Sequence, residues 1–165
     1  MSTIVQLAAD EALIKLDPGL GWREQEQRLI HAFPKVIGWL DEVLPGAASQ
    51  WNIELSPAEQ LDELLGCFCR GENLLYERQV RPLRHLGEGV WEIKTADLRL
   101  FGWFHARDCF ICTAIDLAMR VKEINLYRGY AQEAVRMREA LDLDEPKYIE
   151  GDDPHDVLSS VDFPA

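Results

Sequence analysis

The chain has 165 residues, 47% of them hydrophobic, which is enough for one compact domain with an extension. Its 17 basic and 29 acidic side chains give a net charge of −12, and no apolar run approaches the roughly 20 residues that a membrane-spanning helix needs. Asp10 and Glu11 stand where a secretory signal needs a basic start and an apolar block. A cytoplasmic protein that does not associate with membranes is therefore expected.

The four cysteines do not have the spacing of a metal site. Cys67 and Cys69 are two residues apart on an expected helix, so they point to different sides. Cys109 and Cys112 have an odd spacing on an expected strand, which puts them on opposite faces. Phosphate-loop, dinucleotide and metalloprotease motifs are absent. We expect no metal and no cofactor.

Residues 1–55 are expected to form an N-terminal helical extension. An apolar stripe with helical spacing is the main signal, and it comprises Leu29, Phe33, Val36, Ile37, Leu40 and Leu44. Pro34 lies inside this stripe and predicts a kink or the start of a second helix. For the first 20 residues the pattern leaves a strand and a short helix open.

Residues 56–141 predict an α+β domain with an antiparallel sheet of three to five strands packed against helices. Ser56, Pro57 and Glu59 have the spacing of a capping box and predict a helix that ends near Gly71. The stretches "VWEIKT", "LRLFGWFH" and "CFICTAID" alternate in polarity and are joined by hairpin-length links. A helix over about 124–141 follows, and residues 142–165, with one basic and eight acidic side chains, predict a flexible acidic tail.

Residues 90–140 differ from the rest of this acidic chain because they hold eight basic side chains against seven acidic ones. Cations beside aromatic side chains suit RNA, since cations hold phosphates and aromatic faces stack unpaired bases. A lysine or histidine near a ribose 2′-hydroxyl could remove its proton, and arginines could stabilise the phosphorane that forms. The candidate catalytic residues are Arg120, Lys122, His105 and Arg99, and the candidate substrate-binding residues are Lys94, Arg107 and Arg128.

Each of these side chains also has a plainer interpretation, as a solvated surface cation or as a rim residue whose stem covers an aromatic ring. For Arg120 and Lys122, which follow directly on the third strand, the two interpretations stay evenly balanced.

Residues 60–141 resemble the phage-derived, HigB-like toxins of the RelE superfamily. The stretches "RPLRHLGEGVWEIK", "LRLFGWF", "CFICTAIDLAMRVK" and "RGYAQEAVRMREAL" follow the family's order of "plxxLxxGLWELR", "RIFYFF", "fiLLHgFxKK" and a basic helix. The resemblance implies a RelE-like α+β fold and mRNA cleavage that an antitoxin partner silences. It places Lys94 and Arg99 at the arginines of the first two motifs, Arg120 and Lys122 around the lysine pair, and Arg136 at an arginine of the last helix.

The leading functional hypothesis is a toxin-like endoribonuclease of a toxin–antitoxin system that acts on RNA without a metal. The alternative is a catalytically inactive phage or prophage effector that binds a host protein through an acidic surface imitating nucleic acid. A third hypothesis is that the acidic tail folds back over the cations as a built-in antitoxin.

Overall fold

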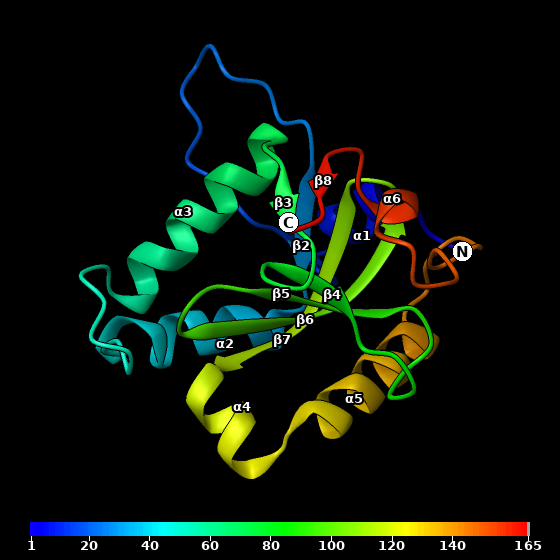
Figure 1. Cartoon of the computed structure of the whole chain (residues 1–165). Helices are drawn as coiled ribbons and strands as arrows, with labels where there is room; N and C mark the ends of the chain where they lie inside the picture. The colour runs from blue at the N-terminus through cyan, green and yellow to red at the C-terminus, as the bar shows by residue number, and fades with distance from the viewer. Residues whose placement is uncertain (165) are drawn as a thin grey trace.

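The computed structural model describes residues 1–164 as an α+β fold built on one mixed, mostly antiparallel sheet of six strands (Figure 1). The strand order is β1-β2-β7-β6-β5-β4, and only β2 and β7 run parallel. These strands are β1 (Ile14–Lys15), β2 (Leu29–Ala32), β4 (Val80–Pro82), β5 (Val90–Lys94), β6 (Leu98–Ala106) and β7 (Cys109–Leu117). The sheet exceeds the three to five strands expected because three of its strands are short segments outside the predicted hairpins.

Helices cover both faces of this sheet (Figure 1). They are α1 (Ile4–Ala9), α2 (Pro34–Glu42), α3 (Pro57–Arg70), α4 (Ala118–Ile124), α5 (Tyr127–Ala140) and α6 (Pro154–Val157), with a 3₁₀ turn at Leu44–Gly46. The main core joins α2 and α3 to one face, and a smaller core joins α5 to the other. Among residues 1–164, no helix combines the length and the apolar character needed to cross a bilayer.

The helix predicted from the capping box is confirmed as α3. Ser56 Oγ accepts a hydrogen bond of 3.2 Å from the Glu59 amide, and Glu59 Oε1 accepts one of 3.1 Å from the Ser56 amide. The helix ends at Gly71, which has a positive φ of 81°. Its apolar side chains, including Leu61, Leu64 and Phe68, are buried against the sheet.

The N-terminal segment differs from the helical extension expected for residues 1–55, because it contributes two strands. Leu29–Ala32 pairs with residues 109–112 of β7, and Ile14–Lys15 pairs with residues 31–32. The apolar spacing that predicted a helix from Leu29 therefore belongs to a strand followed by α2, which begins at Pro34 as expected. Local periodicity could not reveal a partner strand about 80 residues further along the chain.

A β-bulge interrupts the alternation expected for residues 109–116. Phe101 pairs with Ala114 but Gly102 pairs with Cys112, so Thr113 is the extra residue. Residue 102 must be glycine here, because a Cβ would lie 1.9 Å from the Ile111 carbonyl oxygen. After the bulge, Ala114 faces the smaller core under α5.

The C-terminal segment also differs from the flexible tail expected. Leu143, Val157 and Leu158 are buried, and the Ile149 amide donates a 3.0 Å hydrogen bond to the Phe104 carbonyl. A short strand, β8 (Val161–Asp162), pairs in parallel with β3 (Leu74–Leu75) as a separate two-stranded sheet. The apolar residues of this acidic segment therefore hold it against the domain.

Candidate functional site

Three cations surround one buried carboxylate where β5 and β6 turn. Glu92 is fully buried, and its Oε1 lies 3.3 Å from Arg81 Nε, 3.7 Å from Lys94 Nζ and 3.8 Å from Arg99 Nε. Strand pairing brings them together, because Arg81 lies opposite Glu92 and Lys94 lies opposite Arg99. The second carboxylate oxygen of Glu92 accepts no hydrogen bond from the described residues.

A second carboxylate continues this group across β7. Asp116 lies opposite Arg99 on the neighbouring strand. Its Oδ2 accepts a 3.1 Å hydrogen bond from Arg120 Nε and a 2.5 Å hydrogen bond from the Tyr130 hydroxyl. The Tyr130 ring stacks on Phe101 at 4.8 Å between centroids, which fixes its position under α5.

We call this set the sheet-end cluster, and it consists of Arg81, Glu92, Lys94, Arg99, Asp116, Arg120 and Tyr130. The set holds four basic side chains and two carboxylates in a protein whose net charge is −12, and two further carboxylates, Glu77 and Asp97, act on Lys94 and Arg99 respectively. The side chains of Arg120 and Arg81 are 56% and 32% exposed, whereas that of Arg99 is 7% exposed. The cluster thus presents Arg120 and Arg81 to solvent and keeps Arg99 buried.

Burial perturbs two groups of the cluster. It lowers the pKa of Lys94, an effect that the neighbouring Arg81 and Arg99 reinforce and that Glu92 opposes. Burial, together with the hydrogen bond to Asp116, raises the pKa of Tyr130, so its hydroxyl keeps its proton. Lys94 can therefore lose a proton more easily than an ordinary lysine, while Tyr130 remains a donor.

The structure does not bring the whole predicted set of cations together. His105 lies near the other end of β6, six residues from Arg99, which is about 20 Å along a strand. Its Nδ1 lies 3.0 Å from the Lys147 carbonyl oxygen. Arg107 is exposed in the turn after β6. These two residues are therefore separate from the sheet-end cluster.

The candidate cations on helices differ in their positions, and only Arg120 reaches the sheet-end cluster. Arg120 and Lys122 lie on α4 rather than at a strand end, and two residues apart on a helix they point to different sides. Arg120 reaches Asp116, whereas Lys122 Nζ lies 5.5 Å from the centre of the Trp51 ring. Arg128 and Arg136 are exposed on α5.

Arg81, Glu92 and Asp116 were not among the site residues predicted from the sequence. Arg81 lies on a three-residue strand whose pairing with β5 is visible only in the fold. For Glu92 a signal did exist, since it shares a strand face with Lys94 in "VWEIK".

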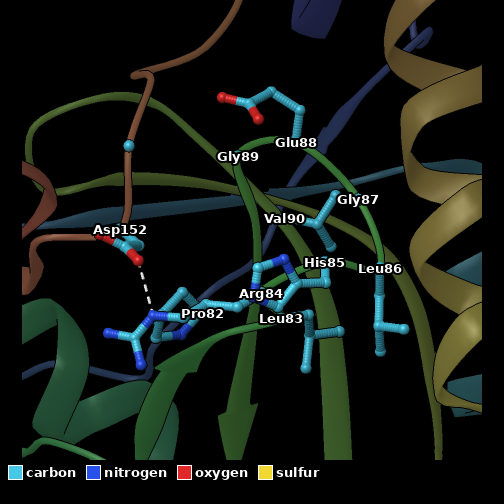
Figure 2. Close-up of a pocket in the computed structure, with 11 residues that line it drawn as sticks. Pro82, Leu83, Arg84, His85, Leu86, Gly87, Glu88, Gly89, Val90 and Asp152 are labelled. Atoms are coloured by element: carbon cyan, nitrogen blue, oxygen red, sulfur yellow. Dashed lines mark hydrogen bonds and ion pairs between the residues drawn. The ribbon is translucent and has the colours of Figure 1, made fainter.

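A hollow lies elsewhere, over the loop that joins β4 and β5 (Figure 2). It has a volume of about 630 Å³, and Arg84 and Asp152 reach toward each other across its edge with a separation of 2.6 Å. This loop follows Pro82 and precedes Val90, so it is at the opposite end of β5 from Lys94. Within residues 1–164, no three His, Cys, Asp or Glu side chains are placed to hold a metal ion together.

The acidic C-terminal segment contacts the end of the sheet that holds His105. Trp103 Nε1 donates a 2.9 Å hydrogen bond to the Lys147 carbonyl, and the Asp108 amide donates one of 2.8 Å to Val157. Among the described residues, the cations of the sheet-end cluster form their ion pairs with Glu92 and Asp116 and not with residues 142–164. The hypothesis that the tail covers the cations therefore has no ion pair to support it at this cluster among the described residues.

Comparisons with known proteins add no relationship. The chain matches no family model, no curated protein and no solved structure.

Proposed function

We propose that this protein is a RelE/HigB-type, toxin-like endoribonuclease that binds and cleaves RNA at the sheet-end cluster. The observation that supports the proposal is the grouping of four basic side chains around two carboxylates at one end of the sheet of an acidic chain. Opposite charge attracts a phosphodiester, and guanidinium groups bind its oxygens in pairs. An antitoxin that covers the cluster would be the natural partner of such a protein.

Lys94 is the base in the proposed reaction. Its neutral amine takes the proton of the ribose 2′-hydroxyl, and the 2′-oxygen attacks the adjacent phosphorus. The bond from phosphorus to the 5′-oxygen then breaks, and this oxygen takes a proton from water. The products are a 2′,3′-cyclic phosphate and a 5′-hydroxyl, and no metal or other reactant is needed.

Arginines supply the charge stabilisation. Arg120 and Arg81, the most exposed cations of the cluster, bind the non-bridging oxygens as negative charge develops on them. Arg99 donates hydrogen bonds of 2.6 and 2.9 Å to the Thr95 and Leu98 carbonyls, so it adds a positive charge that is fixed in place. Tyr130 holds Asp116, and through it Arg120, in position.

The test is cleavage of an RNA substrate in EDTA, with mapping of mRNA 5′ ends in cells that express each variant. Arg120→Ala is expected to reduce the rate by about 10² to 10³ because one charge-stabilising donor is lost. Arg107→Ala is the matched control, an exposed arginine at the far end of the sheet, and should keep the wild-type rate. Intact RNA with the wild-type protein at stoichiometric concentration, in vitro and in cells, would overturn the proposal.

The rate should also depend on pH in a defined direction. Because the pKa of Lys94 is lowered, the neutral amine accumulates as pH rises toward and through that value, and the rate should rise and then level off. Lys94→Arg keeps the charge but removes the base at these pH values, so its residual rate should lose this rise. An unchanged pH profile in Lys94→Arg would assign the base to another group.

The catalytically inactive effector is the second candidate, and two observations favour it. Glu92 and Asp116 compensate half of the positive charge of the cluster, and Asp116 stands where the resembling family has a histidine. This candidate predicts intact RNA with both wild type and Arg120→Ala, together with a host protein that co-purifies after nuclease treatment.

A further inference from the structure

An exposed tryptophan lies beside a lysine of α4, at the end of the sheet that carries the sheet-end cluster. Trp51, in the loop between the 3₁₀ turn and α3, is 48% exposed, and Lys122 Nζ lies 5.5 Å from its ring centre. We propose that Trp51 is a stacking platform for one unpaired RNA base, while Lys122 binds the adjoining phosphate. The inference rests on the proposed function, since it extends the RNA site beyond the reacting phosphate.

The loop that carries Trp51 is held in place by hydrogen bonds. Ser49 Oγ accepts from the amides of Trp51 and Ile53 at 3.3 and 3.2 Å. The Gln50 amide donates to Asp97 Oδ1 at 2.9 Å. An aromatic ring on an ordered loop loses little conformational freedom when a base stacks on it, so the platform is preorganised.

Asp97 connects this loop to the sheet-end cluster. It is 2% exposed and lies in the turn between Lys94 and Arg99. Its backbone carbonyl accepts a 2.7 Å hydrogen bond from the Ala118 amide, where α4 begins. The Trp51 loop, the β5–β6 turn and the start of α4 therefore meet at one buried residue, and Figure 1 shows α4 and the loop before α3 at the same end of the sheet.

The two cations of α4 point to different sides of the helix, one toward Trp51 and the other toward the sheet-end cluster. Lys122 points to Trp51 and Arg120 points to Asp116, so an RNA strand that crosses α4 meets both groups. Single-strand recognition combines these two elements, a positively charged track for the backbone and an aromatic face for a base. This complementarity favours RNA over an apolar protein segment as the occupant.

A second exposed tryptophan provides a matched control. Trp22 is 87% exposed, and Arg23 lies 4.5 Å from its ring centre, so it has the same pairing of aromatic and cation. Its loop contacts the C-terminal end of α3, where Glu24 lies 3.8 Å from Arg70, whereas the Trp51 loop leads into the N-terminal end. The two ends of this 14-residue helix are about 20 Å apart.

The test measures binding of two labelled 12-nucleotide strands by fluorescence anisotropy: a 2′-O-methyl RNA, which cannot be cleaved, and the same backbone without bases. Trp51→Ala should weaken binding of the base-bearing strand about 5- to 150-fold, the effect of losing one base–aromatic stack. Trp51→Phe should restore most of the affinity, and Trp22→Ala should bind as the wild type does. Binding of the abasic strand should not change in any of these variants.

The outcomes separate the two proposals. If the wild type binds the RNA but Trp51→Ala binds it within twofold, or loses the same affinity for the abasic strand, the stacking platform is wrong while the RNA site stands. If Trp51→Ala instead releases only a co-purifying protein, the loop is a protein-binding surface. If the wild type binds neither strand, the proposed function fails, and the platform fails with it.

Discussion

The two ends of the β6–β7 hairpin treat their cations in opposite ways. At the hairpin turn, Arg28 is 1% exposed, and it donates hydrogen bonds to the carbonyls of Phe68, Glu72 and Ser160 and lies 3.4 Å from Asp108. At the other end, the Arg120 side chain is 56% exposed and bonds one carboxylate.

This difference separates a structural cation from a candidate binding cation. The Nη1 and Nη2 atoms of Arg28 bond carbonyls of α3, of Glu72 just after it and of the C-terminal segment, and its Nε forms an ion pair with Asp108, so Arg28 joins three parts of the chain. Arg120 keeps donors that face solvent, and these can bind an anion without breaking the fold. Buried donors that bond the chain itself stabilise the protein, whereas solvent-facing donors are available to a ligand.

Removal of residues 142–165 should have the largest effect on stability. It tests whether the contacts at the hairpin turn, unlike those of the sheet-end cluster, hold the fold together. The deletion removes the buried side chains of Leu143, Val157, Leu158 and Val161 and exposes the core residues that pack against them. Burial of each such side chain contributes about 1.5–3 kcal/mol, so the loss is a large part of a typical stability. We expect an unfolded or aggregated product by circular dichroism. A truncated protein that melts cooperatively near the wild-type temperature would contradict the packing role of this segment.

Arg28→Met should have the next largest effect. It leaves Asp108 without its cation and three carbonyls without their donor, so the free energy of unfolding should fall by about 3–5 kcal/mol. Urea denaturation measures the change. Arg107→Ala, an exposed arginine next to Asp108, is the control and should change it by less than about 0.5 kcal/mol. Equal effects of both substitutions would remove the distinction between the two ends.

Asp97→Asn, in the turn between β5 and β6, should have a smaller effect on stability, and this effect should depend on pH. Burial acts to raise the pKa of Asp97, but hydrogen bonds from Gln60, Ser49 and the Gln50 amide outweigh it and hold the pKa below its ordinary value of 3.8. The stabilisation is therefore present above pH 3.8 and is lost as pH falls through the lowered pKa. Asn should cost about 1–3 kcal/mol at neutral pH, and the difference from wild type should shrink in acid. Melts across pH 2–7 test this, and a pH-independent difference would contradict it.

His105→Ala should have the smallest effect on RNA cleavage, within about twofold. The imidazole lies about 20 Å along β6 from Arg99 and next to the Lys147 carbonyl, away from the proposed reacting phosphate. Initial rates of the purified variant check this expectation. A tenfold loss with an unchanged melting temperature would move part of the reaction to the hairpin turn.

Local patterns in the sequence predicted the elements that depend on neighbours in the chain. The alternating stretches that begin at Val90, Leu98 and Cys109 are strands, and the capping box at Ser56 begins a helix. The helix predicted over about 124–141 is confirmed as α5, which begins three residues later, at Tyr127; the separate helix α4, which ends where Asn125 takes a positive φ of 52°, was not predicted.

Elements that depend on distant partners were not predictable in this way. Leu29–Ala32 is a strand because it pairs with β7. The acidic C-terminal segment is ordered because its few apolar residues are buried against the domain. The site shows the same limit. Lys94, Arg99 and Arg120 were identified as cations, but their carboxylate partners Glu92 and Asp116 follow from strand register, which a bulge at Thr113 sets.

The parallel strand β2 has a consequence for solubility. It occupies hydrogen-bonding groups of residues 109–112 on β7, which would otherwise be the border of the predicted three-stranded hairpin unit. The strands now at the border are two and three residues long, and one of them ends in Pro82. Short, proline-bearing borders give another molecule little backbone to pair with, so the N-terminal segment protects the protein from edge-to-edge aggregation.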